Sequence, residues 1–225
     1  MQEKLEFSNN LLNFIDSLER RNFDALMPGL TLLSKDVPDV KKSLLNQIKP
    51  LTELFSDKFG NDGYKIITKT VFPILDSLLY DSDESVRDKS VSVVSEMRKV
   101  VKEAEKEHIM KLTLDLAHEE NNEKLRETAV KLLNDLAPDM GQELCEFFIV
   151  HEICSLGYDS KSNVRSAVAR NLVNVSKCVS LECFYKKIFP LYRDVLTKDK
   201  EEKVRKTCAE VVSEITQVSP IERTS

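Results

Sequence analysis

A pattern that recurs about every 39 residues limits the fold of this chain more than any other feature. In four units an acidic residue is followed, after four intervening residues of any type, by an aliphatic residue and then an arginine. Apolar residues follow each arginine by seven and ten positions, and a small residue follows it by three or four. Offsets of 3, 7 and 10 lie on one face of a helix. The arginines lie 39, 39 and 40 residues apart and are Arg87, Arg126, Arg165 and Arg205.

Each unit is predicted to be a pair of helices joined by a short polar turn. An apolar residue stands nine positions before each arginine and belongs to the first helix of the pair: Leu78, Ala117, Leu156 and Leu196. The second helix carries the apolar columns Val94, Leu133, Leu172 and Val212, and Met97, Leu136, Val175 and Ile215. Its small-residue column is Ser90, Ala129, Ala169 and Cys208.

An earlier unit is looser, and Val40-Lys41 takes the place of the aliphatic residue and the arginine. The distance from Lys41 to Arg87 is 46 residues, and the excess falls at Phe59–Gly63, which we predict to be an extended loop. Before this unit, apolar residues at helical spacing predict an N-terminal helix: Leu11, Leu12, Ile15 and Leu18.

The predicted fold class is all-α, a right-handed superhelix (α-solenoid) of about five helix pairs with an N-terminal helix. A lone helix pair cannot bury its apolar stripe, whereas stacked pairs form one continuous core. We therefore expect a single array over 1–225, with units at approximately 22–60, 64–102, 103–141, 142–180 and 181–219. Only 5 glycines and 7 prolines among 225 residues disfavour a turn-rich β-sandwich and a glycine-rich nucleotide loop.

The acid in each turn and the arginine behind it are expected to form an ion pair, within one layer or with the next. An exposed pair of this kind contributes only ~0–1 kcal/mol, so its expected role is to set the register of the repeats. Pro73 and Pro190, with Pro28 in the loose unit, are expected to kink the first helix and to start its final segment.

Nothing in the sequence predicts a catalytic or metal site. His151 and Cys154 share a helix face, but the second histidine of a zinc motif is missing, so helix packing is the favoured interpretation. The five cysteines form no CxxC pair, and Cys208 occupies the small-residue column, which favours core packing over a nucleophile. We therefore expect no enzyme activity, no cofactor and no bound metal.

The net charge of −5 argues against a nucleic-acid partner, and no apolar run approaches the length of a membrane span. The start of the chain carries no apolar signal core, and the odd number of cysteines fits a reducing compartment. We expect a protein of the cytoplasm, and also of the nucleus, that binds neither nucleic acid nor membrane.

These repeats resemble HEAT repeats in their period, in Phe72-Pro73-x-Leu75 and Phe189–Leu191, and in the turn pattern itself. Within that class the chain is similar to the regulatory subunits of type-2A-like serine/threonine protein phosphatases. It looks most like those of phosphatase 4 and next like the scaffold subunits of phosphatase 2A. The resemblance covers roughly residues 36–218, and Leu136–Gly141 and Val204–Glu210 carry it most clearly.

The resemblance implies a non-catalytic scaffold that binds a phosphatase catalytic subunit through the turn inside each repeat. Other regulatory proteins are further expected partners. The alternative is a HEAT-repeat adaptor for nuclear transport or cytoskeletal partners. Carried over to this chain, the partner-binding turn residues are Asp36, Asp39, Asp81, Asp83, Glu84, Glu120, Asn122, Asp159, Lys161, Lys198, Asp199 and Glu202. The four arginines of the pattern are expected to fix the register of the repeats.

Overall fold

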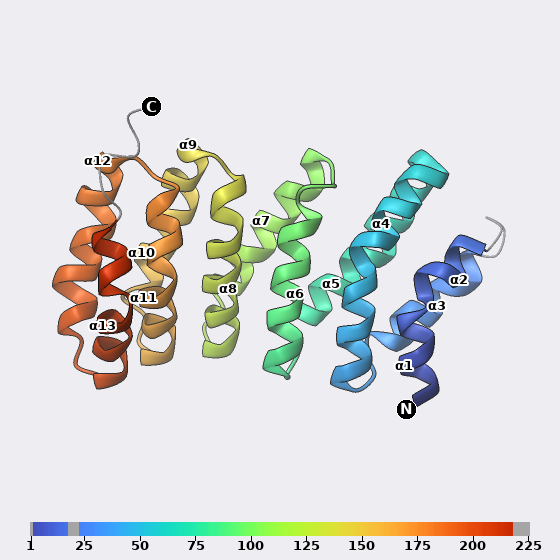
Figure 1. Ribbon diagram of the computed structural model, residues 1–225, viewed down its shortest axis with the longest axis horizontal. Coiled ribbons are helices and arrows are strands. Elements are labelled where there is room, and N and C mark those ends of the chain that lie inside the picture. Colours follow the sequence, from blue (N-terminus) through green and yellow to red (C-terminus); the bar gives the residue numbers. More distant parts are fainter. Residues whose placement is uncertain (1, 18–22, 218–225) are drawn as a thin grey trace. The chain divides into compact units, whose positions relative to one another are not determined.

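The computed structural model describes residues 2–17 and 23–217, and every regular element within these residues is helical (Figure 1). Some predicted positions lie outside the described residues: Leu18 of the N-terminal helix, position 22 of the first repeat and positions 218–219 of the last repeat. Spatial proximity groups the chain into two compact units that meet in sequence between Met110 and Lys111. The boundary falls inside one helix, α7 (Glu103–Ala117).

The first unit contains the leader and the first two helix pairs. Two short helices, α1 and α2, pack against α4, and α3 and α4 form the first pair. A helix made of the end of α4, η2 and α5 then pairs with α6. The bounds are α1 (Gln2–Asn9), α2 (Leu11–Ser17), α3 (Phe23–Leu33), α4 (Pro38–Ile66), η2 (Ile67–Val71), α5 (Phe72–Leu79) and α6 (Glu84–Met97).

The second unit follows the same plan, and its second helices α8, α11 and α13 pack in sequence. Short helical segments joined end to end make up the first helices of its last two pairs. The bounds are α8 (Glu123–Leu136), η3 (Ala137–Asp139), α9 (Gln142–Leu144), η4 (Cys145–Ile149), α10 (Val150–Leu156), α11 (Ser162–Lys177), α12 (Leu181–Cys183), η5 (Phe184–Ile188), η6 (Leu191–Val195), η7 (Leu196–Lys198) and α13 (Glu202–Thr216). The predicted all-α solenoid of helix pairs is confirmed, and its right-handed superhelical twist stays a prediction.

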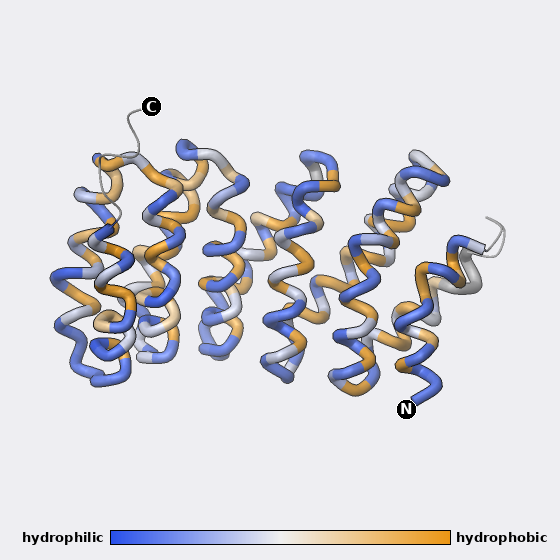
Figure 2. Tube along the Cα trace, in the orientation of Figure 1, coloured by the Kyte–Doolittle hydropathy of each residue, from blue (hydrophilic) through white to orange (hydrophobic). Residues whose placement is uncertain are grey.

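The apolar columns form the core of each unit, and Figure 2 shows apolar positions recurring between polar ones along the helices. The small-residue column is fully buried, from Ser90 to Cys208, which lets neighbouring second helices pack closely. One expectation is wrong: the side chain of Val212 is 45% exposed. Its counterpart Leu172 is buried on α11, which packs between α8 and α13, whereas α13 has no helix beyond it among the described residues.

The predicted extended loop at Phe59–Gly63 is also wrong, because the chain reverses there within a single residue. Gly60 has φ +50° and ψ −123°, and the residues on both sides of it stay helical. This positive φ is open to glycine at little cost. The additional residues of this repeat lengthen the helices on both sides of the turn. Gly63 lies so close to the preceding segment that a Cβ would meet the Phe55 carbonyl oxygen at 1.8 Å.

The prolines lie inside the first helices, as expected, beside π-helical segments in two of three cases. Pro73 follows the π-helical segment η2, and Pro190 stands between η5 and η6. A π-helical turn changes the carbonyl to which each N–H bonds, which helps a helix to continue past a proline. Pro28 lies inside α3. The segment η4 is π-helical without a proline, and nothing in its sequence explains this.

Candidate functional site

The arginine of each of the four repeats donates hydrogen bonds to the backbone of the turn that precedes it. The Nη1 atom of Arg165 donates to the backbone carbonyl oxygens of Asp159 and Ser160, at 2.7 and 3.2 Å. Arg87, Arg126 and Arg205 make the equivalent pair of bonds to the turns before them. Two carbonyl oxygens at each turn therefore have a charged donor, which fixes the conformation of the turn.

Two of these arginines, Arg126 and Arg165, also join neighbouring repeats. Arg165 donates from Nε and Nη2 to the two carboxylate oxygens of Asp199, at 2.6 and 2.8 Å. Arg126 holds Asp159 in the same way, at 2.6 and 3.0 Å. In the first unit Lys41 takes this role and contacts Asp81 at 2.7 Å. We call these three pairs, Lys41–Asp81, Arg126–Asp159 and Arg165–Asp199, the inter-repeat ladder.

The ladder corrects the expectation that these pairs are exposed. Arg126 and Arg165 are only 7% and 6% exposed, and the side chain of Asp199 is buried. The hydrogen bond from Arg165 holds the pKa of Asp199 below its ordinary value. For Asp159, burial acts to raise the pKa, but the hydrogen bond from Arg126 helps to bring it below the ordinary value. For Arg126 and Arg165 the expected ion pair is thus a buried bidentate pair with the next layer, and the role of the four arginines in setting the register stays a prediction.

The predicted partner-binding residues therefore differ in what their side chains contact. Asp81, Asp159 and Asp199 use their carboxylates in the ladder, and Asp36 is engaged by Lys4 at 2.6 Å. Asp83 and Asn122 cap helices α6 and α8 through their side chains. The predicted residues whose side chains are exposed are Asp39, Glu84, Glu120, Asn122, Lys161, Lys198 and Glu202. For all of these residues, partner binding itself stays a prediction.

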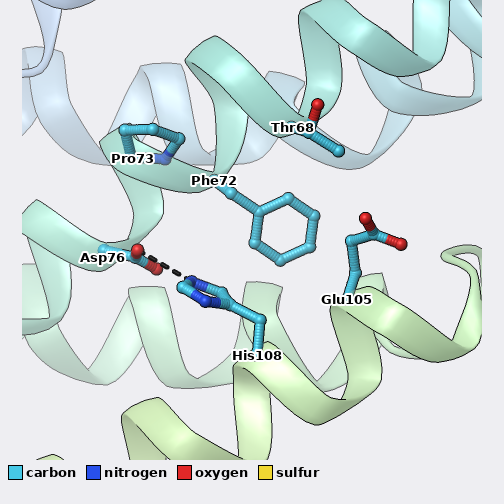
Figure 3. A pocket seen from close by; sticks show the side chains of 6 residues that line it. All are labelled: Thr68, Phe72, Pro73, Asp76, Glu105 and His108. Carbon is cyan, nitrogen blue, oxygen red and sulfur yellow. Dashed lines mark hydrogen bonds and ion pairs between the residues drawn. The ribbon is translucent and has the colours of Figure 1, made fainter.

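A pocket in the first unit was not predicted from the sequence. It lies between η2 and α5 on one side and the start of α7 on the other (Figure 3). Its volume is about 240 Å³, and its lining is Thr68, Phe72, Pro73, Asp76, Glu105 and His108. The Nε2 atom of His108 lies 2.9 Å from Oδ2 of Asp76. The ring of Phe72 packs edge-on against the imidazole with centroids 5.6 Å apart.

Two carboxylate oxygens of this pocket are buried and have no hydrogen-bond partner in the described part of the chain, Oδ1 of Asp76 and Oε2 of Glu105. Desolvation by burial raises the pKa of Asp76, although the charge and the hydrogen bond of His108 act in the opposite direction. Within the described part of the chain, no lysine or arginine lines the pocket. The pocket is therefore rich in acceptors and offers few donors.

The remaining histidine and cysteine candidates have structural surroundings. His118 contacts the buried carboxylate of Glu152 at 3.0 Å, and His151 is exposed. Among the described residues no group of three or more His, Cys, Asp or Glu side chains could hold a metal ion. Burial raises the pKa of the Cys154 and Cys208 thiols to about 11, which disfavours the thiolate that a nucleophile needs.

No protein-family model matches the chain, and no curated protein matches it. Solved structures do resemble it. The MAST/Orbit N-terminal domain has a TM-score of 0.60 at 22% identity, over 97% of this chain and 92% of that one. A Kap121p mutant has a TM-score of 0.54 at 14% identity, over 96% of this chain and 26% of that one. A designed armadillo repeat protein in complex with a (KR)4 peptide has a TM-score of 0.45 at 17% identity, over 87% of this chain and 89% of that one.

At these identities the likeness shows the fold alone, which is an all-α repeat solenoid of the armadillo and HEAT type. No helix among the described residues is both long enough and apolar enough to cross a membrane.

Proposed function

We propose that this chain is a non-catalytic scaffold that binds the catalytic subunit of a type-2A-like serine/threonine phosphatase and positions its substrates. The class of partner comes from the sequence resemblance of the repeats. The observation that carries the binding role is the way in which the turns are built. Their backbone is fixed by the arginine–carbonyl bonds, while charged side chains such as Glu120 and Lys161 stay exposed.

A preformed surface of this kind suits a scaffold. Side chains on a fixed backbone lose little conformational freedom when a partner binds, so more of the contact energy contributes to affinity. A scaffold that holds both a catalytic subunit and its substrate also raises their effective concentration, without making or breaking a bond itself. The catalytic metals would then belong to the partner.

The test is an affinity capture of the full chain from its native lysate, followed by identification of the bound proteins by mass and an assay of phosphatase activity. We expect a type-2A-like catalytic subunit in near-equal amount. Recovery of transport factors or cytoskeletal proteins without phosphatase activity would refute the phosphatase assignment and support the alternative adaptor.

A variant pair then tests the turns of the second unit. Glu120→Lys with Lys161→Glu reverses two exposed turn charges without changing the net charge and without touching the ladder. Glu214→Lys with Lys206→Glu is the matched control on exposed positions of α13. We expect the first variant to lose the phosphatase and the control to retain it. Equal capture by both would exclude these turns as the binding surface.

A further inference from the structure

The pocket between α5 and α7 has a composition that selects for cations. Two carboxylates, from Asp76 on α5 and Glu105 on α7, reach it from separate helices. The remaining lining is aromatic, aliphatic or weakly polar: Thr68, Phe72, Pro73 and His108. Because no lysine or arginine among the described residues lines the pocket, no basic side chain on its described wall neutralises both acids.

Two carboxylate oxygens without a hydrogen-bond partner among the described residues further favour a cationic ligand that donates hydrogen bonds. Oδ1 of Asp76 and Oε2 of Glu105 are both buried and accept no hydrogen bond from the described residues, whereas Oδ2 of Asp76 is engaged by His108. A buried acceptor without a donor is costly, and more so when it is charged. A ligand that donates to both oxygens would remove this cost. In Figure 3 the ring of Phe72 is seen between Glu105 and the Asp76–His108 pair, and it lines the same pocket.

We propose that this pocket binds an arginine side chain of a partner protein. A guanidinium group is planar, stays charged and has five N–H donors and no acceptor, so it can bond carboxylates on two helices while its plane packs on an aromatic ring. A lysine ammonium is a compact point charge and fits two separated acceptors less well. A metal ion fits poorly, because no group of three ligating side chains exists among the described residues. The pocket lies on first helices rather than in the turns, so this proposal is independent of the phosphatase assignment.

The chain contains a built-in reporter and a built-in control for a test by nuclear magnetic resonance. Histidine occurs only three times, so selective labelling of the imidazole carbons gives three resolvable sets of signals. His108 lines the pocket, whereas His118 pairs with Glu152 outside it. The probe is the methylamide of acetyl-arginine, and the methylamide of acetyl-citrulline is its neutral counterpart. The lysine derivative tests the preference between the two cations.

We expect the arginine probe to displace the His108 signals saturably and to leave the His118 signals in place. The citrulline probe should leave both unchanged, and the lysine probe should bind more weakly. Asp76→Asn and Glu105→Gln should each weaken the binding at least about tenfold, because each removes a charged acceptor. Circular dichroism checks that both variants stay helical, and the glutamine variant carries the test if the asparagine variant does not fold.

Three results would overturn the proposal. The first is the absence of any saturable displacement of His108. The second is an equal response to arginine and to citrulline or lysine. The third is a folded Glu105→Gln variant that binds arginine as tightly as the unmodified chain.

Discussion

Arg165→Met is expected to destabilise the second unit much more than Arg205→Met, although both arginines occupy the same place in their repeats. Both donate to two turn carbonyls. Arg165 additionally holds the buried carboxylate of Asp199 through bonds of 2.6 and 2.8 Å. Arg205 is exposed, and its Nε and Nη2 atoms have no partner among the described residues.

The magnitude follows from what each substitution leaves behind. Removing one partner of a buried ion pair costs about 3–5 kcal/mol, because the other charge stays buried and uncompensated. Loss of the exposed carbonyl bonds of Arg205 costs about 1–2 kcal/mol. We therefore expect the two variants to differ by about 1–4 kcal/mol in unfolding free energy.

Urea unfolding followed by circular dichroism measures this difference. Amide hydrogen exchange in α11 and α13 locates it, since a repeat array need not unfold in a single step. A third variant tests the cause: adding Asp199→Asn to Arg165→Met removes the stranded charge and should recover more than half of the loss. Equal losses for Arg165→Met and Arg205→Met, or no recovery in the double variant, would refute the assignment of the stability to the buried pair.

Three further outcomes are expected. The pKa values of Asp159 and Asp199 are lowered in the folded chain, so both carboxylates stabilise it fully above their ordinary pKa of about 4, and this stabilisation is lost as the pH falls through the folded pKa values. Urea unfolding over a pH series should show this loss of unfolding free energy, and a variant with asparagine at both positions should lose less. Gly63→Ala should destabilise the chain by about 2–3 kcal/mol in thermal melts, because its Cβ would meet a backbone oxygen at 1.8 Å. The Cβ of Gly29→Ala in α3 meets no atom within 4 Å, so this variant should stabilise the chain by up to about 1 kcal/mol in the same measurement. Cys208 should react with iodoacetamide at pH 7 far more slowly in the folded chain than in urea, as followed by mass, because burial raises the pKa of its thiol to about 11; equal rates would contradict its burial.

The helix pairs and the members of the ladder could be predicted from the sequence, because each repeat supplies the same residues at the same offsets. The partner of each arginine could not. Asp159 lies six residues before Arg165 and Asp199 lies 34 residues after it, and the spacing allows either pairing. The stacked helices decide between them: the carbonyls of the arginine's own turn take one edge of the guanidinium, and the next repeat takes the other.

The chain reversal at Gly60 is a second feature that could not be predicted from the sequence. Two glycines within five residues are typical of a loop, and composition alone cannot distinguish a loop from a sharp helix–helix turn. The deciding facts are one positive φ at Gly60 and the close approach of Gly63 to Phe55, and both depend on how the two helices pack. A glycine with no room for a Cβ is visible only once that packing is known.

The pocket was missed because its residues do not belong to the repeat pattern. The position 39 residues after Asp76 is Asp115, which is exposed on α7, and the one 39 residues after His108 is Phe147, which is exposed in η4. Residues that recur in every repeat are required by the stack, so they take part wherever two repeats meet and cannot by themselves distinguish one partner from another. Specificity in an array of this kind has to come from positions at which one repeat departs from the others. Glu105 and His108 are such positions: the residues one period later are Leu144 and Phe147. Together with Asp76 and the ring of Phe72 they line a pocket that the period alone would not produce.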